Sequence, residues 1–336
     1  MKKLLVIRND KLGDFMLAWP AFAMLKQSMP DTKLVALVPS YTAQIAKVCP
    51  YLDEVIIDTK ELGETILEVK KYQFDGVISF FSNFDNAKLV WKAKIPYRLA
   101  PATKLFQFLY NHRLTQRRSH SKKAEFEYNL DLAREFLRQQ NITIVEPQRP
   151  YLSFDEISLQ QQKDKLSSQL KLDQNKKWLF VHSSTGGSAN SLSLQQYTDL
   201  VKAILAHYDC QVILTAGPNE GEKANSLATQ INDERVVVYD KNEGMVDFSC
   251  SLACSDLFIS GSTGPLHICG ALDIPTIGFY PSNRSASPIR WQPTNNPNNH
   301  ISFCPPATKE TEKDLTVISI PAALDTILPF IKKIWQ

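Results

Sequence analysis

The feature that most restricts the fold is an alternation of short apolar runs with helix-patterned segments. In the first half, four runs have the length of buried strands, at residues 4–7, 34–38, 55–57 and 76–79. Segments between them have helical periodicity, at residues 18–28 and 42–48. Strands that are apolar on both faces and separated by helices indicate a parallel sheet covered on both sides.

The second half of the chain restarts this pattern. Five runs have strand character, at residues 178–182, 211–215, 235–239, 257–260 and 276–280. Helical segments separate them, at residues 194–207 and 222–232. A chain of 336 residues also exceeds what one hydrophobic core usually organises. The sequence therefore predicts an α/β protein made of two Rossmann-like, doubly wound domains that face each other across a cleft.

The domain boundary is expected within residues 148–176. Pro147 and Pro150 interrupt structure there, and a polar helical stretch follows at 158–172. We place the first domain at 1–160 and the second at 161–317. Residues 318–336 are predicted to form a C-terminal helix, because their apolar residues recur at helical spacing.

Charge and cysteine usage exclude several classes of function. The net charge of +3 is too small to indicate nucleic acid as a partner. The sequence has no apolar run long enough to span a membrane, and the run after Met1 is too short for a secretory signal, so a cytoplasmic location is expected. The six cysteines lie in apolar contexts without a histidine cluster. We therefore expect buried, reduced thiols and no zinc site. No cofactor is expected.

The loop at residues 8–14, with the sequence RNDKLGD, directly follows the first predicted strand. Ligands of doubly wound folds bind at the carboxyl ends of strands, so this loop is expected at the cleft. Gly13 permits close approach of a ligand, and Asp14 is expected near the start of the next helix. Position alone favours Asp14 as a helix cap over a catalytic group, and Asp10 competes for the catalytic role.

A second motif, FISGSTGPLH, occupies residues 258–267. A strand is predicted to end in a turn of small residues, with a helix beginning near Pro265. Backbone amides at Gly264, together with the hydroxyls of Ser262 and Thr263, would form an anion site suited to a diphosphate. The alternative is a plain strand-to-helix turn with hydroxyl caps. His267, one turn into the helix, would face either a ligand or the core.

Two further loops follow predicted strands of the second half. The loop SSTGGSAN at 183–190 offers phosphate ligands from Ser184, Thr185, Gly186 and Asn190. It has neither the P-loop ending nor the dinucleotide fingerprint, which argues against a kinase and a dehydrogenase. In the loop AGPNEGE at 216–222, Glu220 would accept hydrogen bonds from a ribose or sugar. A flexible loop and a capped turn are the respective alternatives.

The stretch from residue 98 to residue 123 is basic and has no acidic residue. Its basic side chains are Arg98, Lys104, Arg113, Arg117, Arg118, Lys122 and Lys123. Interleaved Phe106, Phe108 and Tyr110 would let it bind a phosphorylated or carboxylated amphiphile, or an anionic membrane surface. A solvated loop is the alternative.

These motifs together resemble one family. The opening strand and loop with Gly13 and Asp14, followed by Pro20 and a helix, resemble the amino terminus of the bacterial ADP-heptose:lipopolysaccharide heptosyltransferases. So does the segment 262–267 with its continuation at 271–277, and the resemblance covers nearly the whole chain in order. It implies a GT-B fold with an amino-terminal acceptor domain and a carboxyl-terminal donor domain.

The activity that this resemblance implies is an inverting, metal-independent transfer of heptose from ADP-heptose to the Kdo/heptose inner core of lipopolysaccharide. Asp14 matches the family's general base, Thr185 its donor-phosphate contacts and Glu220 a nucleoside contact. The acceptor, of lipid A–Kdo type, would be bound by a larger set: Asp10, Lys11, Arg98, Arg113, Arg117, Arg118 and Lys122. The chain would contact the cytoplasmic face of the inner membrane peripherally.

Two positions depart from that family's pattern. Ser262 stands where many members have an aspartate that contacts the heptose hydroxyls, and Asn190 falls near a lysine that some members have. These departures leave open another nucleotide sugar as donor. Two alternatives from other classes are a nucleotide-sugar epimerase or hydrolase on the same architecture, and a non-catalytic protein that binds acidic glycolipid.

Overall fold

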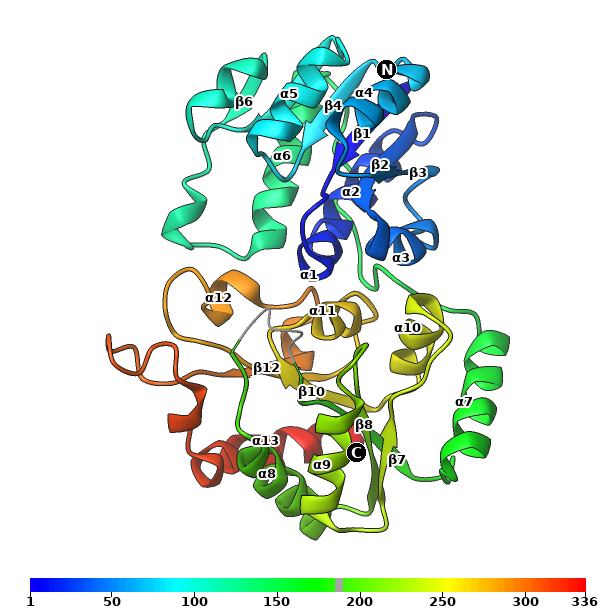
Figure 1. Cartoon of the computed structure of the whole chain (residues 1–336), viewed down its shortest axis with the longest axis vertical. Helices are drawn as coiled ribbons and strands as arrows, with labels where there is room; N and C mark the ends of the chain where they lie inside the picture. The colour runs from blue at the N-terminus through cyan, green and yellow to red at the C-terminus, as the bar shows by residue number, and fades with distance from the viewer. Residues whose placement is uncertain (185–189) are drawn as a thin grey trace. The chain divides into compact units, whose positions relative to one another are not determined.

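The computed structural model of the chain describes residues 1–184 and 190–336. It consists of two compact units, Met1–Tyr151 and Leu152–Gln336 (Figure 1). The boundary expected at residue 160 falls inside α7 (Glu156–Leu170), where Asp155 caps the first turn by accepting a hydrogen bond from the Ser158 N–H. The polar stretch after the prolines is thus the first helix of the second unit.

The first unit contains a six-stranded parallel sheet in the order β3-β2-β1-β4-β5-β6. Its strands are β1 (Lys3–Ile7), β2 (Lys33–Pro39), β3 (Glu54–Asp58), β4 (Gly76–Ser79), β5 (Tyr97–Pro101) and β6 (His112–Leu114). Its helices are α1 (Leu12–Met16), α2 (Trp19–Ser28), α3 (Ala43–Lys47), α4 (Leu62–Tyr72), α5 (Phe84–Lys92) and α6 (Glu125–Gln139). Short 3₁₀ helices complete it: η1 (Ser40–Thr42), η2 (Leu105–Leu109) and η3 (Arg118–His120).

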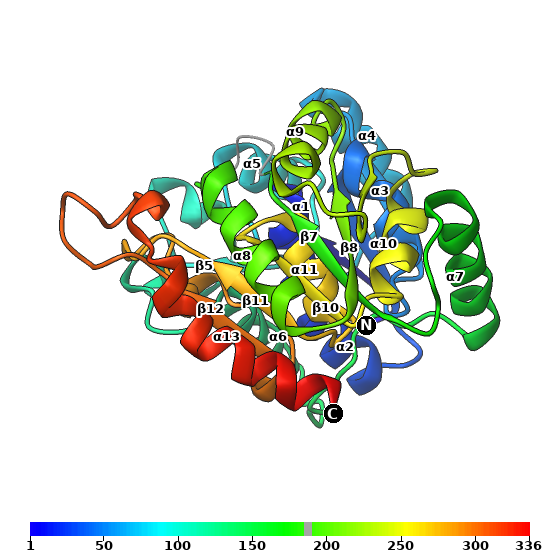
Figure 2. The same cartoon turned by 90° about the horizontal axis from the view of Figure 1, so that it is seen from below.

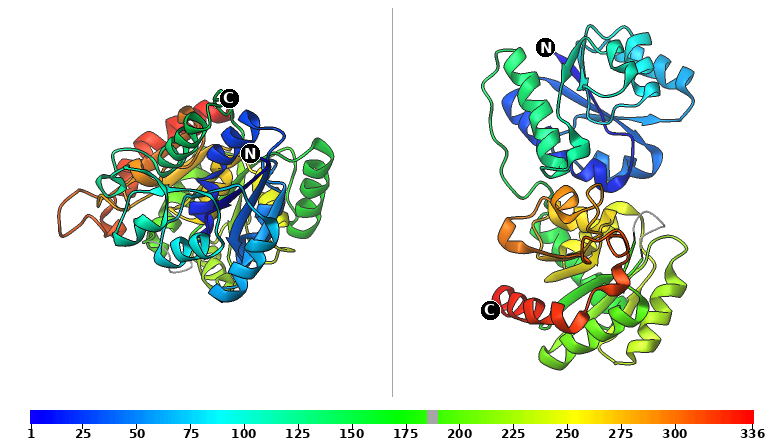
Figure 3. Two further views of the ribbon diagram at one scale, coloured as in Figure 1. Left: turned by 90° about the horizontal axis from the view of Figure 1, so that it is seen from above. Right: turned by 90° about the vertical axis from the view of Figure 1, so that its left-hand side faces the viewer.

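The described part of the second unit contains another six-stranded parallel sheet, in the order β12-β11-β10-β7-β8-β9. Its strands are β7 (Lys177–His182), β8 (Cys210–Thr215), β9 (Val236–Tyr239), β10 (Leu257–Gly261), β11 (Thr276–Phe279) and β12 (His300–Phe303). After α7 its helices are α8 (Leu194–His207), α9 (Gly221–Ile231), α10 (Met245–Ala253), α11 (Gly264–Ala271), α12 (Pro288–Trp291), α13 (Ile320–Trp335), η4 (Pro297–Asn299) and η5 (Leu315–Val317). Helices cover both faces of each sheet (Figure 3).

The nine strands expected from the sequence are all present, each within one residue of its expected ends. The central strands are buried because the flanking helices cover both sheet faces, and Leu4 through Ile7 on β1 are inaccessible to solvent. The edge strands β3 and β9 are less buried, and Ile57 on β3 is exposed. The predicted C-terminal helix is α13, which packs beside α8 (Figure 2) and shares its hydrophobic core. Strands β5, β6 and β12 lie at or near sheet edges and were not expected.

Other expectations had mixed outcomes. All six cysteines are free thiols, and five are buried, but Cys304 is exposed, so its expected burial was wrong. Within residues 1–184 and 190–336, none of the helices combines the length and the hydrophobicity that crossing a membrane requires. Because all strands are parallel, the loops after β1, β4 and β5 share one edge of the first sheet, and those after β7, β8 and β10 share one edge of the second.

The packing of α11 makes a stability prediction. A Cβ at Gly270 would lie 2.5 Å from Pro293 Cβ and 2.9 Å from the Thr294 backbone nitrogen. We expect Gly270→Ala to lower the free energy of unfolding by about 1–3 kcal/mol, in spite of alanine's better helix propensity. Gly63→Ala in α4 is the matched control, since a Cβ there meets no heavy atom within 4 Å. Urea unfolding measures both variants. If Gly270→Ala had the same free energy of unfolding as the wild type, the surrounding residues would have to move apart without loss of stability, which would contradict the prediction.

Candidate functional site

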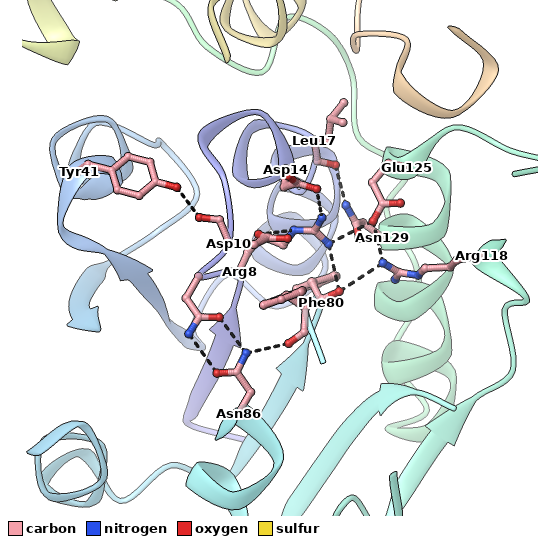
Figure 4. A network of polar contacts seen from close by, with 12 residues as sticks. Arg8, Asp10, Asp14, Leu17, Tyr41, Phe80, Asn86, Arg118, Glu125 and Asn129 are labelled. Carbon is pink, nitrogen blue, oxygen red and sulfur yellow. Dashed lines mark hydrogen bonds and ion pairs between the residues drawn. The ribbon is translucent and has the colours of Figure 1, made fainter. Parts of the chain in front are cut away.

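The loop after β1 carries a network of charges centred on Arg8 (Figure 4). The Arg8 guanidinium is buried and contacts three carboxylates. Its Nε lies 3.0 Å from Asp10 Oδ1, its Nη2 2.6 Å from Asp14 Oδ1, and its Nη1 3.1 Å from Glu125 Oε1. Nη1 also donates a hydrogen bond of 3.0 Å to the Phe80 carbonyl at the end of β4. One arginine therefore joins β1, α1, β4 and α6.

A second arginine completes this network. Arg118 Nη1 donates to Glu125 Oε1 at 2.7 Å and to the Phe80 carbonyl at 3.3 Å. Glu125 is thus shared by two guanidinium groups, and the cluster holds three carboxylates against two arginines. Arg118, which was predicted to contact the acceptor, thus also stabilises this cluster.

Asp14 lies in the first turn of α1, as expected, but it does not cap the helix. Among the described residues, α1 has no side-chain hydrogen bond at its N-cap, Lys11, and the Asp14 carboxylate accepts from Arg8 instead. The cap interpretation is therefore wrong. Asp14 remains 14% exposed. The helix itself is fixed by buried Phe15 and by Asn129, whose Nδ2 donates to the Leu17 carbonyl at 3.0 Å.

Burial and neighbouring charges shift the pKa values of Arg8 and Asp10 in this network. Burial acts to lower the pKa of Arg8, but the three carboxylates outweigh it and the pKa is raised, so the guanidinium stays charged. For Asp10, burial and the nearby Asp14 charge raise the pKa to about 7, although Arg8 opposes them. The Tyr41 hydroxyl donates to the Asp10 carbonyl at 2.5 Å and helps to fix this loop.

The same loop is tied to the start of α5 through Asn9. Its Nδ2 donates to Asn86 Oδ1 at 3.0 Å, and Asn86 Nδ2 donates back to Asn9 Oδ1 at 2.8 Å. Asn86 Nδ2 also donates to the Phe81 carbonyl, and the Asn83 side chain caps α5 by accepting from the Asn86 N–H. Asn86 and Glu125 were not identified from the sequence, because both reach the loop from distant positions.

The basic stretch is partly structural. Arg98 donates from Nε to the Leu109 carbonyl at 2.9 Å and from Nη1 to the Ile95 carbonyl at 2.5 Å, so it holds its own unit together. Lys123 pairs with Asp131 at 2.6 Å. The stretch contains β6, η2 and η3, so it is not the plain solvated loop of the alternative. Other predicted acceptor residues are exposed: Lys11, Arg113, Arg117 and Lys122.

In the second unit, β10 ends at Gly261 and α11 begins at Gly264, as the motif predicts. The N-cap, Thr263, makes no side-chain cap hydrogen bond to any described residue. Ser260 Oγ instead donates to the Gly261 carbonyl at 2.7 Å and lies 3.3 Å from Thr263 Oγ1. The hydroxyl-cap alternative is therefore wrong, and the first amides of α11 are available for an anion. Ser262 lies in this turn, half-buried.

His267 is buried one turn into α11. Burial lowers its pKa to about 3, with a smaller contribution from nearby His300, so the imidazole is neutral. Its Nδ1 has no hydrogen-bond partner in the described part of the chain. A neutral ring can exchange a hydrogen bond with a ligand but cannot neutralise a phosphate.

The remaining donor-loop residues lie near the carboxyl ends of β7 and β8. Ser184 is buried, whereas Thr185 and Gly186 lie outside the described residues. Asn190 Nδ2 donates to the Lys313 carbonyl. Glu220 Oε2 accepts from the Gly217 N–H at 3.0 Å, so its carboxylate also shapes its own turn.

Two side chains beside these loops were missed by the sequence analysis. His182 Nε2 lies 4.0 Å from Glu220 Oε2, and burial lowers the pKa of His182 to about 4. Lys223 Nζ donates to the Ser183 carbonyl at 3.0 Å, which brings a positive charge to the loop that contains Ser184. The feature of the sequence that could have indicated Lys223 is its place in the first turn of α9, directly after the loop that contains Gly217 and Gly221.

Across residues 1–184 and 190–336, no three His, Cys, Asp or Glu side chains are grouped to hold a metal ion.

Solved structures share this arrangement of two sheets. ADP-heptose lipopolysaccharide heptosyltransferase II of E. coli matches with a TM-score of 0.79 at 18% identity, covering 99% of both chains. A family 9 glycosyl transferase from Veillonella parvula DSM 2008 matches with a TM-score of 0.81 at 15% identity, covering 99% of this chain and 97% of that one. E. coli heptosyltransferase WaaC with ADP has a TM-score of 0.72 at 18% identity, with 98% of each chain covered. The fold is GT-B, as expected.

Sequence comparison adds the family. Residues 64–317 match the model of glycosyltransferase family 9 (heptosyltransferase). A Haemophilus influenzae protein described as a candidate glycosyltransferase is 60% identical over 341 residues, covering 100% of this chain and 99% of that protein. The chain belongs to glycosyltransferase family 9, and it is a glycosyltransferase.

The raised pKa of Asp10 predicts a pH dependence of stability. From pH about 4 to about 7, the folded chain keeps a proton on Asp10 that the unfolded chain releases. This contribution to stability is present at low pH and lost as pH rises to about 7. We therefore expect the free energy of unfolding of the wild type to fall, relative to Asp10→Asn, across this window, as urea unfolding at several pH values would show.

An opposite-sign control is available in the same unit. The Lys3 N–H holds the pKa of Asp75 below its ordinary value, so the wild type should lose stability relative to Asp75→Asn as pH falls into the acid range. A constant difference between the wild type and Asp10→Asn from pH about 4 to about 7 would contradict the raised pKa of Asp10.

Proposed function

We propose that this chain transfers heptose from ADP-heptose to the Kdo/heptose inner core of lipopolysaccharide, with inversion and without a metal. The observation that carries the proposal is Asp14, a partly exposed carboxylate in the first turn of α1, held by the buried Arg8. The family's description as heptosyltransferase supports the donor sugar. Structurally similar E. coli WaaC carries ADP in one structure and ADP-2-deoxy-2-fluoro heptose in another.

In this mechanism Asp14 acts as the general base. Its carboxylate removes the proton from the acceptor hydroxyl as that oxygen attacks the anomeric carbon, on the face opposite ADP. The new C–O bond forms as the bond to the ADP oxygen breaks, and ADP leaves with the electron pair. Arg8 fixes the orientation of Asp14 through the contact of 2.6 Å from its Nη2, and the same guanidinium is held by Asp10 and Glu125.

The second unit supplies donor binding. The amides at the start of α11 stabilise the charge that develops on the leaving diphosphate, and the Ser262 and Thr263 hydroxyls add hydrogen bonds. Lys223 brings a positive charge beside Ser184, which matters because Asn190 carries none. In this proposal Thr185 and Gly186 contact the donor phosphates, and Glu220 contacts the nucleoside. The buried His267 offers the donor a neutral hydrogen-bonding group.

The acceptor-binding role goes to the exposed cations of the first unit. Arg113, Arg117 and Lys122 are exposed, and Lys11 lies at the start of α1 beside Asp14. Their charge suits the carboxylates and phosphates of an inner-core acceptor. Asp10 is suited to hydrogen bonding with acceptor hydroxyls.

Ser262 favours one second candidate, which is the same reaction with another nucleotide sugar. A serine hydroxyl accepts and donates hydrogen bonds without charge, so it holds sugar hydroxyls less tightly than an aspartate would. The reaction and the base are the same in both candidates, and only the sugar differs.

Replacing the base tests the reaction. We expect Asp14→Asn to lower the rate of transfer by roughly 10²–10⁴-fold, because it removes the proton acceptor. Affinity for ADP, measured by calorimetry, should change little. Asp31→Asn, at an exposed carboxylate of the same unit, is the matched control and should keep full activity. Transfer by Asp14→Asn above about a tenth of the wild-type rate would rule out Asp14 as the base.

A thermal-shift panel tests the donor. ADP and ADP-heptose should raise the unfolding temperature, since a ligand that binds the folded chain at 100 times its Kd adds about 2.7 kcal/mol. UDP and UDP-N-acetylglucosamine should have no effect at the same concentration. Equal stabilisation by uridine nucleotides would contradict the proposed donor, and acceptor-independent consumption of the nucleotide sugar would indicate an epimerase or hydrolase.

A further inference from the structure

Two neighbouring elements of the first unit, α5 and η2, expose large apolar side chains. Leu105 is 91% exposed and Phe108 71%, and Phe84 and Trp91 on α5 are also exposed. We define the α5–η2 surface by six residues: Phe84, Lys88, Trp91, Lys92, Leu105 and Phe108. Large apolar side chains gathered on a surface generally indicate a binding site.

The spacing of these residues places them on one surface. Phe84, Lys88 and Trp91 lie at helical positions i, i+4 and i+7 of α5, which share a face. Leu105 and Phe108 are three apart in a 3₁₀ helix, where side chains at that spacing align. The two elements pack together, and the rings of Phe84 and Phe106 meet edge to face, with centroids 6.4 Å apart.

Lysines are interleaved with the apolar side chains. Lys88 Nζ lies 6.0 Å from the centre of the Phe84 ring, and Lys92 Nζ lies 5.2 Å from the centre of the Trp91 ring. Lys104 directly precedes Leu105 and is exposed. Asp85 is the single acidic residue from position 84 to position 109 of the sequence. Aromatic and leucine side chains mixed with lysines are suited to the boundary between acyl chains and anionic headgroups.

We propose that the α5–η2 surface docks the chain on an anionic phospholipid bilayer. Trp91, Leu105 and Phe108 enter the headgroup–acyl boundary, and the lysines contact lipid phosphates. A second copy of the chain fits less well, because a two-fold contact through this surface would bring the same lysines together.

The α5–η2 surface belongs to the same unit as Asp14, so docking through it would bear on the proposed reaction. The start of α5 follows β4 directly, at the sheet edge that carries the Arg8 loop, whereas η2 ends beside the amino end of β5, where Arg98 donates to the Leu109 carbonyl. Asn9 of that loop is hydrogen bonded to Asn86 of α5. Docking through this surface would therefore hold the unit that carries Asp14 at the same bilayer that anchors a lipid-linked acceptor. This use rests on the proposed function, whereas the docking itself does not.

Vesicle co-sedimentation of the full chain tests the docking. We expect the wild type to bind vesicles of phosphatidylethanolamine and phosphatidylglycerol but not of phosphatidylcholine, with binding that weakens as salt is added. The double variant Leu105→Ser, Phe108→Ser should lose at least about tenfold in partitioning, because two inserted side chains become polar. Lys88→Gln with Lys92→Gln should also weaken binding to the anionic vesicles.

The matched control is the double variant Leu67→Ser, Ile157→Ser, whose side chains are 63% and 71% exposed but lie on α4 and α7. It should bind vesicles as the wild type does. Heptose transfer to a water-soluble, delipidated acceptor should be unchanged in Leu105→Ser, Phe108→Ser, which separates failure of docking from failure of the proposed reaction. A wild type that does not bind anionic vesicles would overturn the proposal. An equal loss of vesicle binding in the control variant would also overturn it. Self-association of the wild type that is abolished in Leu105→Ser, Phe108→Ser but not in the control would instead assign the surface to a contact between copies of the chain, and would overturn the proposal as well.

Discussion

The arrangement of the first unit depends on the buried guanidinium of Arg8 and its three carboxylate partners, Asp10, Asp14 and Glu125. These groups come from the loop that directly follows β1, from α1 and from α6. Removing one partner from a buried ion pair costs roughly 3–5 kcal/mol, because the other charge is left uncompensated. Burial, with a smaller contribution from the Asp14 charge, raises the pKa of Asp10 to about 7, while the three carboxylates keep Arg8 charged.

The predicted donor site of the second unit relies on different physical features. Its turn at 261–264 offers backbone amides and hydroxyls, and both His182 and His267 are kept neutral because burial lowers the pKa of each. Lys223 supplies the positive charge that the described part of the donor loop does not, since its ammonium group donates to the Ser183 carbonyl. Preorganised dipoles suit a leaving diphosphate, whose charge develops during the reaction, whereas a base requires a fixed carboxylate.

The sequence predicts what local pattern determines. Nine strands lie within one residue of their expected positions, because each contains a short apolar run that the sequence displays directly. β6 was missed because it is a three-residue edge strand that exposes Arg113. The RNDKLGD loop pointed to Asp10 and Asp14, but not to Glu125, which is 117 positions from Arg8 and contacts it only in the folded chain. The sequence could not distinguish Arg98 from Arg113, because both are basic residues of the same stretch. Of the two, Arg98 is the one that donates to backbone carbonyls in the described structure.

The connection from β4 to α5 links the reaction to the proposed lipid contact. The Phe80 carbonyl accepts from Arg8 and Arg118, and the Phe81 carbonyl accepts from Asn86. The segment that anchors both arginines therefore also fixes the start of α5, on which Phe84 is exposed. A force on α5 at a bilayer acts on a helix that is hydrogen bonded to the catalytic loop. If the proposed docking takes place, a change in this segment should disturb both the docking and the orientation of Asp14.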